Sequence, residues 1–93
     1  MWTIELNRKV SKSLKKLPYD VQVNFDIWAD AAAVEGPQEL RQVAGFRDEA
    51  LKGIWKGYRS SRLSKQYRVI YQVRKEIVSI LVIDVSAHDY KRK

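Results

Sequence analysis

The clearest pattern of apolar and polar positions lies between Arg59 and Asp84, where three apolar, β-branched and aromatic runs are separated by polar breaks. These runs predict strands over about 57–63, 66–74 and 77–85. Positions 74–76 are too few for anything but a short hairpin connection, so the last two strands should be antiparallel. The last run is predominantly apolar, which is typical of a central strand.

The middle strand alternates, so its side chains fall on two different faces. One face carries the side chains of Tyr67, Val69, Tyr71 and Val73. The other face carries those of Arg68, Ile70, Gln72 and Arg74. The first face therefore suits a core, and the second combines apolar positions with cations.

The N-terminal third changes from alternation to helical spacing. Residues 2–6 alternate and predict a short strand, and Asn7 is a suitable N-cap for a helix over 8–17. A second helix is expected from Pro18 or Tyr19 to Val34 or Glu35, because Pro18 ends one helix and suits the first turn of the next. Its expected buried face repeats at helical spacing and comprises Val21, Phe25, Trp28 and Ala32.

Residues 37–53 give a weaker pattern, in which one further helical turn over 37–41 is followed by a loop. A short strand is possible over 51–55. The expected fold is α+β, with the element order β-α-α-β-β-β. It comprises an N-terminal strand, a helical hairpin packed on one sheet face and a three- to four-stranded, mainly antiparallel sheet. Residues 1–93 form one expected domain.

Composition limits the cellular compartments and the classes of binding partner that are expected for this chain. The chain has no cysteine and no apolar run long enough to cross a bilayer, and 1–10 do not resemble a signal peptide, so we expect a cytoplasmic protein without membrane contact. A formal net charge of +7 favours polyanionic partners such as nucleic acid or an acidic protein. The alternative is a basic surface that serves solubility alone.

Cations on the predicted strands suggest an anion site. Arg62 and Arg68 fall on neighbouring antiparallel strands, where facing residues lie about 5 Å apart. Two guanidinium groups at that distance repel each other unless an anion bridges them, and a planar guanidinium matches phosphate oxygens. The ordinary alternative is that these arginines are solvated or paired with carboxylates. Trp2, Trp28 and Trp55 are expected to pack in the core or at the sheet edge rather than stack on bases.

Metal-assisted chemistry is not expected, because one histidine, no cysteine and scattered carboxylates offer no ligand set for zinc or paired magnesium ions. No cofactor motif is present either. Cleavage of a phosphodiester would then rely on acid–base side chains and cations. RNA permits this route, since its 2′-hydroxyl can attack the adjacent phosphorus and leave a cyclic phosphate, whereas DNA lacks that hydroxyl.

Two segments carry a family resemblance: residues 51–73 read LKGIWKGYRSSRLSKQYRVIYQV, and residues 88–92 read HDYKR. Together they resemble the RelE/ParE superfamily of type II toxin–antitoxin toxins, especially RelE, YoeB and HigB. The resemblance implies a ribosome-dependent endoribonuclease that cleaves mRNA in the ribosomal A site and so inhibits translation. It also implies a cognate antitoxin, expected to be an acidic, partly disordered segment that folds on the basic domain.

The resemblance assigns roles by position. Arg68 would stabilise the charged transition state, with Arg62 beside it; Glu49 matches a glutamate of the YoeB-like branch. His88 and Tyr90 would complete the active-site edge. Further RNA or phosphate contacts would come from Lys56, Lys65 and Arg59, although alternation places Arg59 on the face opposite Arg62.

Two other functions remain open. ParE-like chains share the fold but act on DNA gyrase without cutting RNA, and they generally lack the terminal histidine and tyrosine. His88 and Tyr90 therefore favour the nuclease. The third possibility is a non-catalytic basic domain that binds RNA or an acidic protein.

Overall fold

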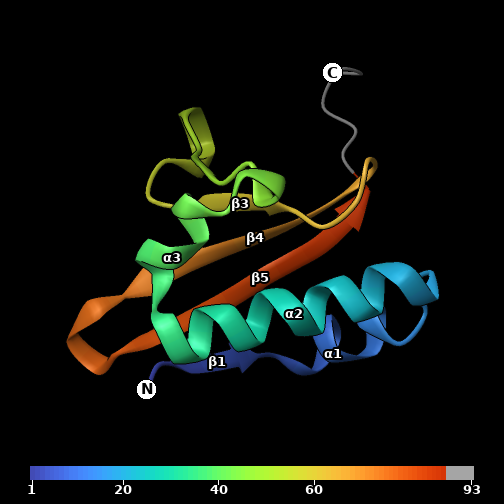
Figure 1. Cartoon of the computed structure of the whole chain (residues 1–93), viewed down its shortest axis with the longest axis horizontal. Helices are drawn as coiled ribbons and strands as arrows, with labels where there is room; N and C mark the ends of the chain where they lie inside the picture. The colour runs from blue at the N-terminus through green and yellow to red at the C-terminus, as the bar shows by residue number, and fades with distance from the viewer. Residues whose placement is uncertain (88–93) are drawn as a thin grey trace.

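The computed structural model describes residues 1–87, and Figure 1 shows their arrangement. Five strands form one sheet, and the longer helices cover one of its faces. The helices are α1 (Arg8–Leu14), α2 (Tyr19–Glu35) and α3 (Pro37–Gln42). The strands are β1 (Thr3–Leu6), β2 (Glu49–Ala50), β3 (Arg59–Arg62), β4 (Tyr67–Arg74) and β5 (Ser79–Ala87). The expected α+β architecture is confirmed.

The sheet has the order β1-β5-β4-β3-β2. The pairs β2–β3, β3–β4 and β4–β5 are antiparallel, and β1 pairs parallel to β5 over Thr3–Leu6. β5 therefore lies inside the sheet, as its apolar sequence predicts. The sheet has five strands rather than three or four, because β1 and the two-residue β2 extend its two edges.

Local sequence signals explain the helix bounds. The Asn7 side chain accepts a hydrogen bond from the backbone N–H of Val10 at 2.7 Å, as expected of an N-cap. α1 ends at Leu14 rather than at Leu17, and the N–H groups of Lys16 and Leu17 donate to the carbonyls three residues before them, which forms a tighter turn ahead of Pro18. α2 ends at Gly36, whose φ of +89° suits glycine; a Cβ there would lie 2.9 Å from Trp2 Nε1.

The core lies between the helices and the sheet. The expected α2 face is confirmed, since Val21, Phe25, Trp28 and Ala32 are all buried. Trp28 is completely buried and meets Tyr71 of β4 edge-on, with ring centroids 5.3 Å apart. This contact fixes which face of β4 points to the helices.

The segment between α3 and β3 differs from the expected strand over 51–55. The strand there is the pair Glu49–Ala50, and the chain then forms a 3₁₀ turn over Gly53–Trp55. Gly53 and Gly57 adopt φ of +67° and +98°, values that an extended strand does not use. The segment thus projects from the β3 edge of the sheet as a compact arm, seen near β3 in Figure 1.

The β4–β5 connection is longer than the expected turn over 74–76. It is a 3₁₀ turn over Lys75–Ile77, followed by Val78 in the left-handed region at φ +49°. β5 therefore begins at Ser79. Within residues 1–87, no helix is both long and apolar enough to cross a membrane.

Candidate active site

The sheet face that points away from the helices carries two rows of polar side chains. Facing Cα partners across four strands place Glu49, Ser60, Ile70 and Asp84 in one row. The neighbouring row holds Arg62, Arg68 and Ser86. Residues two apart on a strand are separated by about 7 Å, so a cationic row runs beside a row that ends in two carboxylates.

An open groove of about 470 Å³ lies over these rows. Its sheet side is lined by Ser60, Arg68, Ile70, Asp84, Ser86 and Ala87. Its other side is formed by the projecting arm, which contributes Glu49, Leu51, Lys52 and Trp55. The volume falls in the range of about 300–1,000 Å³ that is usual for small-molecule sites.

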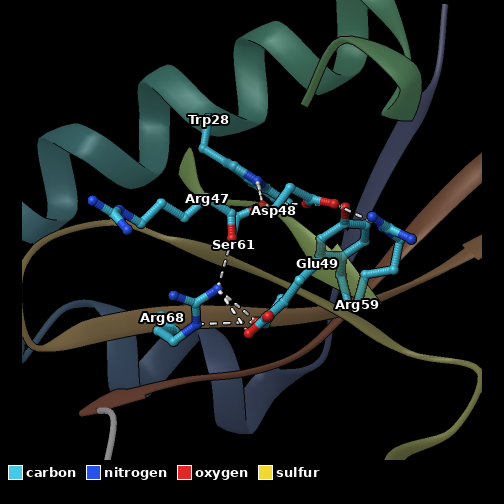
Figure 2. A network of polar contacts seen from close by, with 9 residues as sticks. Trp28, Arg47, Asp48, Glu49, Arg59, Ser61 and Arg68 are labelled. Carbon is cyan, nitrogen blue, oxygen red and sulfur yellow. Dashed lines mark hydrogen bonds and ion pairs between the residues drawn. The ribbon is translucent and has the colours of Figure 1, made fainter. Parts of the chain in front are cut away.

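Arg68 is the most constrained cation of the groove. Its Nε and Nη2 donate to Ser60 Oγ at 3.0 and 2.8 Å, and its Nη2 also donates to the Arg47 carbonyl at 3.1 Å. The Glu49 carboxylate lies 3.8 Å from the same nitrogen, and Figure 2 shows these two side chains directed toward one another. The Arg68 side chain is 12% exposed and that of Glu49 is 57% exposed. A fixed guanidinium thus stands beside a carboxylate that solvent and ligand can reach.

Arg62 is the direct cross-strand partner of Arg68, which confirms that the two arginines are neighbours. Arg62 is half-buried, and within residues 1–87 no carboxylate lies at ion-pairing distance from it. Its charge therefore adds to that of Arg68 at the edge of the groove. The two cations are the expected setting for a bound phosphate.

A second polar network lies on the opposite, helix-covered face. The Asp48 carboxylate is completely buried and accepts from Arg59 Nε at 2.7 Å, from the Ser61 hydroxyl at 2.6 Å and from the Tyr71 hydroxyl. Ser61 in turn accepts from Trp28 Nε1 at 2.9 Å. The network therefore joins α2, β3 and β4 to the start of β2 (Figure 2).

Arg59 therefore does not lie where it could contact a phosphate in the groove. It lies on the face opposite Arg62, as alternation predicts, and it holds Asp48 rather than facing the groove. Burial alone would lower the pKa of Arg59, but the hydrogen bond and the charge of Asp48 outweigh it and raise that pKa. The guanidinium is thus a permanent internal partner of a buried carboxylate.

The Arg47–Glu49 segment connects the two faces. Arg47 adopts φ +43°, in the left-handed region that is uncommon for residues other than glycine, and its carbonyl accepts from Arg68. Asp48 reaches into the interior, and Glu49 reaches toward the groove. The buried Asp48 contacts therefore set the position of two groups that touch Arg68.

Burial raises the pKa of the Tyr71 hydroxyl, and its bond to the negative Asp48 raises it further. The unfolded chain releases this proton near pH 10, whereas the folded chain still holds it, so stability should fall as the pH rises above about 10. We expect the free energy of unfolding to fall more steeply there in the native protein than in Tyr71→Phe, by up to about 1.4 kcal/mol per pH unit. Urea unfolding measured from pH 8 to 11 checks this; equal slopes would contradict it.

The remaining candidates lie apart from the groove or outside the described residues. Lys56 is exposed at the end of the 3₁₀ turn, and Lys65 is exposed in the β3–β4 connection, beside Pro18 and Asp20; neither lines the groove. His88 and Tyr90 lie outside the described residues. Ala87, which precedes His88 in the sequence, lines the groove.

Besides apolar lining, sequence reasoning did not assign Lys52, Trp55, Ser60, Asp84 and Ser86 to a site. Trp28 packs in the core as expected, whereas Trp55 packs edge-on against Tyr58, is 39% exposed and lines the groove. The alternation of β3 carries a signal for Ser60, whereas a register shift between β4 and β5 breaks the alternation of β5 before Asp84. No signal of that kind exists for Lys52 and Trp55, because they lie in the irregular arm.

Comparison with other proteins supplies structural matches but no sequence matches. No protein-family model matches the chain, and neither does any curated protein. Among solved structures, the archaeal RelE–RelB complex from Pyrococcus horikoshii OT3 matches with a TM-score of 0.74 and 25% identity, over 96% of this chain and 97% of that one. The YoeB–YefM complex from Staphylococcus aureus matches with a TM-score of 0.72 and 16% identity, over 95% and 98% of the two chains.

A third structure, the YoeB/ParE toxin from Agrobacterium tumefaciens, matches with a TM-score of 0.73 and 17% identity, over 92% of this chain and 98% of that one. All three matches span nearly the full length of both chains, so they cover the helices, the sheet and the groove together. The resemblance seen in the sequence and the match in structure agree. The chain therefore has the fold of the RelE and YoeB toxins, and its structural matches are toxins of the RelE/ParE type.

Proposed function

We propose that this protein is the toxin of a type II toxin–antitoxin pair and a ribosome-dependent endoribonuclease that cleaves mRNA in the A site. One observation carries the proposal: Arg68 and Glu49 face each other across 3.8 Å in an open groove, and Arg62 adjoins Arg68 on the next strand. Such a groove offers cations for a phosphate and a carboxylate for proton transfer in one place. RelE and YoeB are among the structures of the same fold.

The chemistry follows from what each group can do. A base removes the proton of the 2′-hydroxyl, the 2′-oxygen attacks phosphorus, and the 5′-oxygen leaves with a proton from an acid. Glu49 suits the base because its exposed carboxylate can accept a proton. Arg68 stabilises the negative charge that develops on the phosphorus oxygens. We assign the acid to the terminal pair of His88 and Tyr90.

The partners follow from charge and from the related complexes. The net charge of +7 suits both ribosomal RNA and an acidic antitoxin. Toxins of the same fold occur in complexes with RelB and YefM. We propose a cognate antitoxin for this chain as well, and cytoplasmic action on translating ribosomes. The exposed Lys56 and Lys65 would contact ribosomal RNA outside the groove.

The Glu49→Gln variant tests the proposed chemistry. Glutamine keeps the shape but cannot accept the proton, so cleavage should slow by about 10²–10⁴-fold. Expression in cells followed by mapping of mRNA 5′ ends should show cuts within translated frames for the native protein and few for the variant. Glu76→Gln, in the distant β4–β5 connection, is the matched control and should cut normally.

The same experiment separates the nuclease from its main rival. The match to a YoeB/ParE toxin keeps gyrase inhibition as the second candidate. Growth arrest with intact mRNA and with gyrase trapped on DNA would replace the proposed function by that one. Growth arrest without either effect would leave a basic binding domain.

A further inference from the structure

Part of the groove has no role in the proposed cleavage. Trp55 and Lys52 of the projecting arm line this part together with Asp84 of β5. We infer that this part forms a nucleobase pocket, in which an RNA base that carries an amino group stacks on Trp55 and donates to Asp84. The inference rests on the proposed function because it takes the ligand to be RNA. It goes further by assigning the base and the phosphate of one nucleotide to separate parts of the groove.

Trp55 is held in place although its ring is partly exposed. Its backbone N–H donates to the Lys52 carbonyl at 3.2 Å, its own carbonyl accepts from the Tyr58 N–H at 3.0 Å, and the Tyr58 ring meets its ring edge-on at 5.7 Å. These contacts leave it 39% exposed on the groove side of the arm. A fixed, accessible indole is the usual platform for stacking an unpaired base.

The apolar surface around the ring suits a base better than a phosphate. Leu51 and Ile70 line the same groove, so the flat faces of a base would meet apolar groups on both sides. The groove volume of about 470 Å³ is sufficient for a single nucleotide. The groove therefore matches one base that has been removed from its stack.

The charges of the two rows orient that nucleotide. Arg62 and Arg68 occupy one row, and Asp84 ends the neighbouring row about 7 Å away. A phosphate is attracted to the arginines and repelled by Asp84, so the base takes the Asp84 side. Lys52 lies on the arm side of the groove, where it can contact the next phosphate.

Asp84 makes the pocket selective. Its Oδ2 accepts from the Ser86 hydroxyl at 2.9 Å, and within residues 1–87 no cation pairs with it. Its free lone pairs accept from the exocyclic amino groups of adenine, cytosine or guanine. Uracil has carbonyl oxygens in place of that amino group, and these repel a carboxylate. The pocket should therefore prefer amino-bearing bases to uracil.

The test uses a probe that cannot be cleaved. Trinucleotides with 2′-O-methyl groups and a central A, C, G or U are titrated into the purified protein, with affinity measured calorimetrically and tryptophan fluorescence followed in parallel. We expect quenching of the native protein and of Trp2→Phe, and loss of the quenched signal in Trp55→Phe. Trp55→Ala should weaken binding by about 5- to 150-fold, as expected for a lost base–aromatic stack.

Two comparisons decide the outcome. Asp84→Asn should narrow the difference between the A and U trimers, because the neutral amide no longer repels the carbonyl oxygens of uracil. Thermal melts show whether each variant is folded. Equal affinity in native protein and Trp55→Ala, or no binding by the native protein, would overturn the inference. The probe cannot be cleaved, so its binding does not depend on nuclease activity. Base-selective binding of the probe without mRNA cleavage in cells would contradict the proposed nuclease and still support the base pocket.

Discussion

The Arg68→Ala variant is expected to cleave mRNA about 10²–10³-fold more slowly than the native protein, the usual cost of removing one transition-state donor. Arg68 is bound to Ser60 and to the Arg47 carbonyl before any substrate arrives, so its charge needs no rearrangement as the reaction proceeds. Single-turnover cleavage on mRNA-programmed ribosomes measures the effect. The loss should appear in the maximal rate rather than in the concentration at half-saturation.

Arg74 provides the matched control for this prediction. It lies on the same face of β4, six residues from Arg68 and outside the groove, so Arg74→Ala should cleave at nearly the native rate. Arg68→Lys keeps the charge without the planar fork and should recover only part of the activity. Equal rates in native protein and Arg68→Ala would remove Arg68 from the mechanism.

The Asp48→Ala variant is expected to lose about 3 kcal/mol of unfolding free energy, toward the lower end for breaking a buried ion pair because Arg59 keeps some access to water. The change removes the acceptor shared by Arg59, Ser61 and Tyr71 and leaves these donors without a partner inside the protein. Urea unfolding at neutral pH measures the loss.

Asp26, exposed on α2, supplies the control carboxylate, and Asp26→Ala should change stability by less than about 0.5 kcal/mol. Asp48→Asn keeps the shape and one acceptor oxygen, so its loss of unfolding free energy should lie between those of Asp26→Ala and Asp48→Ala. If Asp48→Ala unfolded at the native urea concentration, the buried network would not hold the Arg47–Glu49 segment. Asp48→Asn is also the better variant for cleavage assays, because it tests the position of Glu49 and Arg68 in a folded protein.

Regular periodicity explains most of what the sequence could predict. Alternation in 66–74 placed Arg68 on the face opposite Tyr71, and helical spacing placed Trp28 in the core; both placements are confirmed. The neighbouring positions of Arg62 and Arg68 followed from pairing two adjacent antiparallel strands. These features depend on repeating geometry, which a single sequence displays directly.

The features that the sequence did not predict depend on contacts between segments whose apolar and polar residues do not repeat at a regular spacing. The arm over 51–58 takes its shape from Gly53 and Gly57 at positive φ, so nothing in the sequence indicated that Trp55 turns toward the sheet. In the sequence, Asp48 is one of two adjacent carboxylates, and nothing distinguishes it from Glu49. Its burial follows from contacts with Tyr71, Ser61 and Arg59, which lie 11 to 23 residues away in the chain. A buried carboxylate has no sequence pattern of its own.

The parallel pairing of β1 with β5 has a consequence for synthesis of the protein. The first strand is joined to the sheet only by the strand that is made after all the others. β5 also contributes Asp84 and Ser86 to the groove. A chain emerging from the ribosome N-terminus first therefore has neither a closed sheet nor a complete groove until residues 79–87 are out. Under the proposed function, the ribosome that makes the toxin is protected from it during elongation.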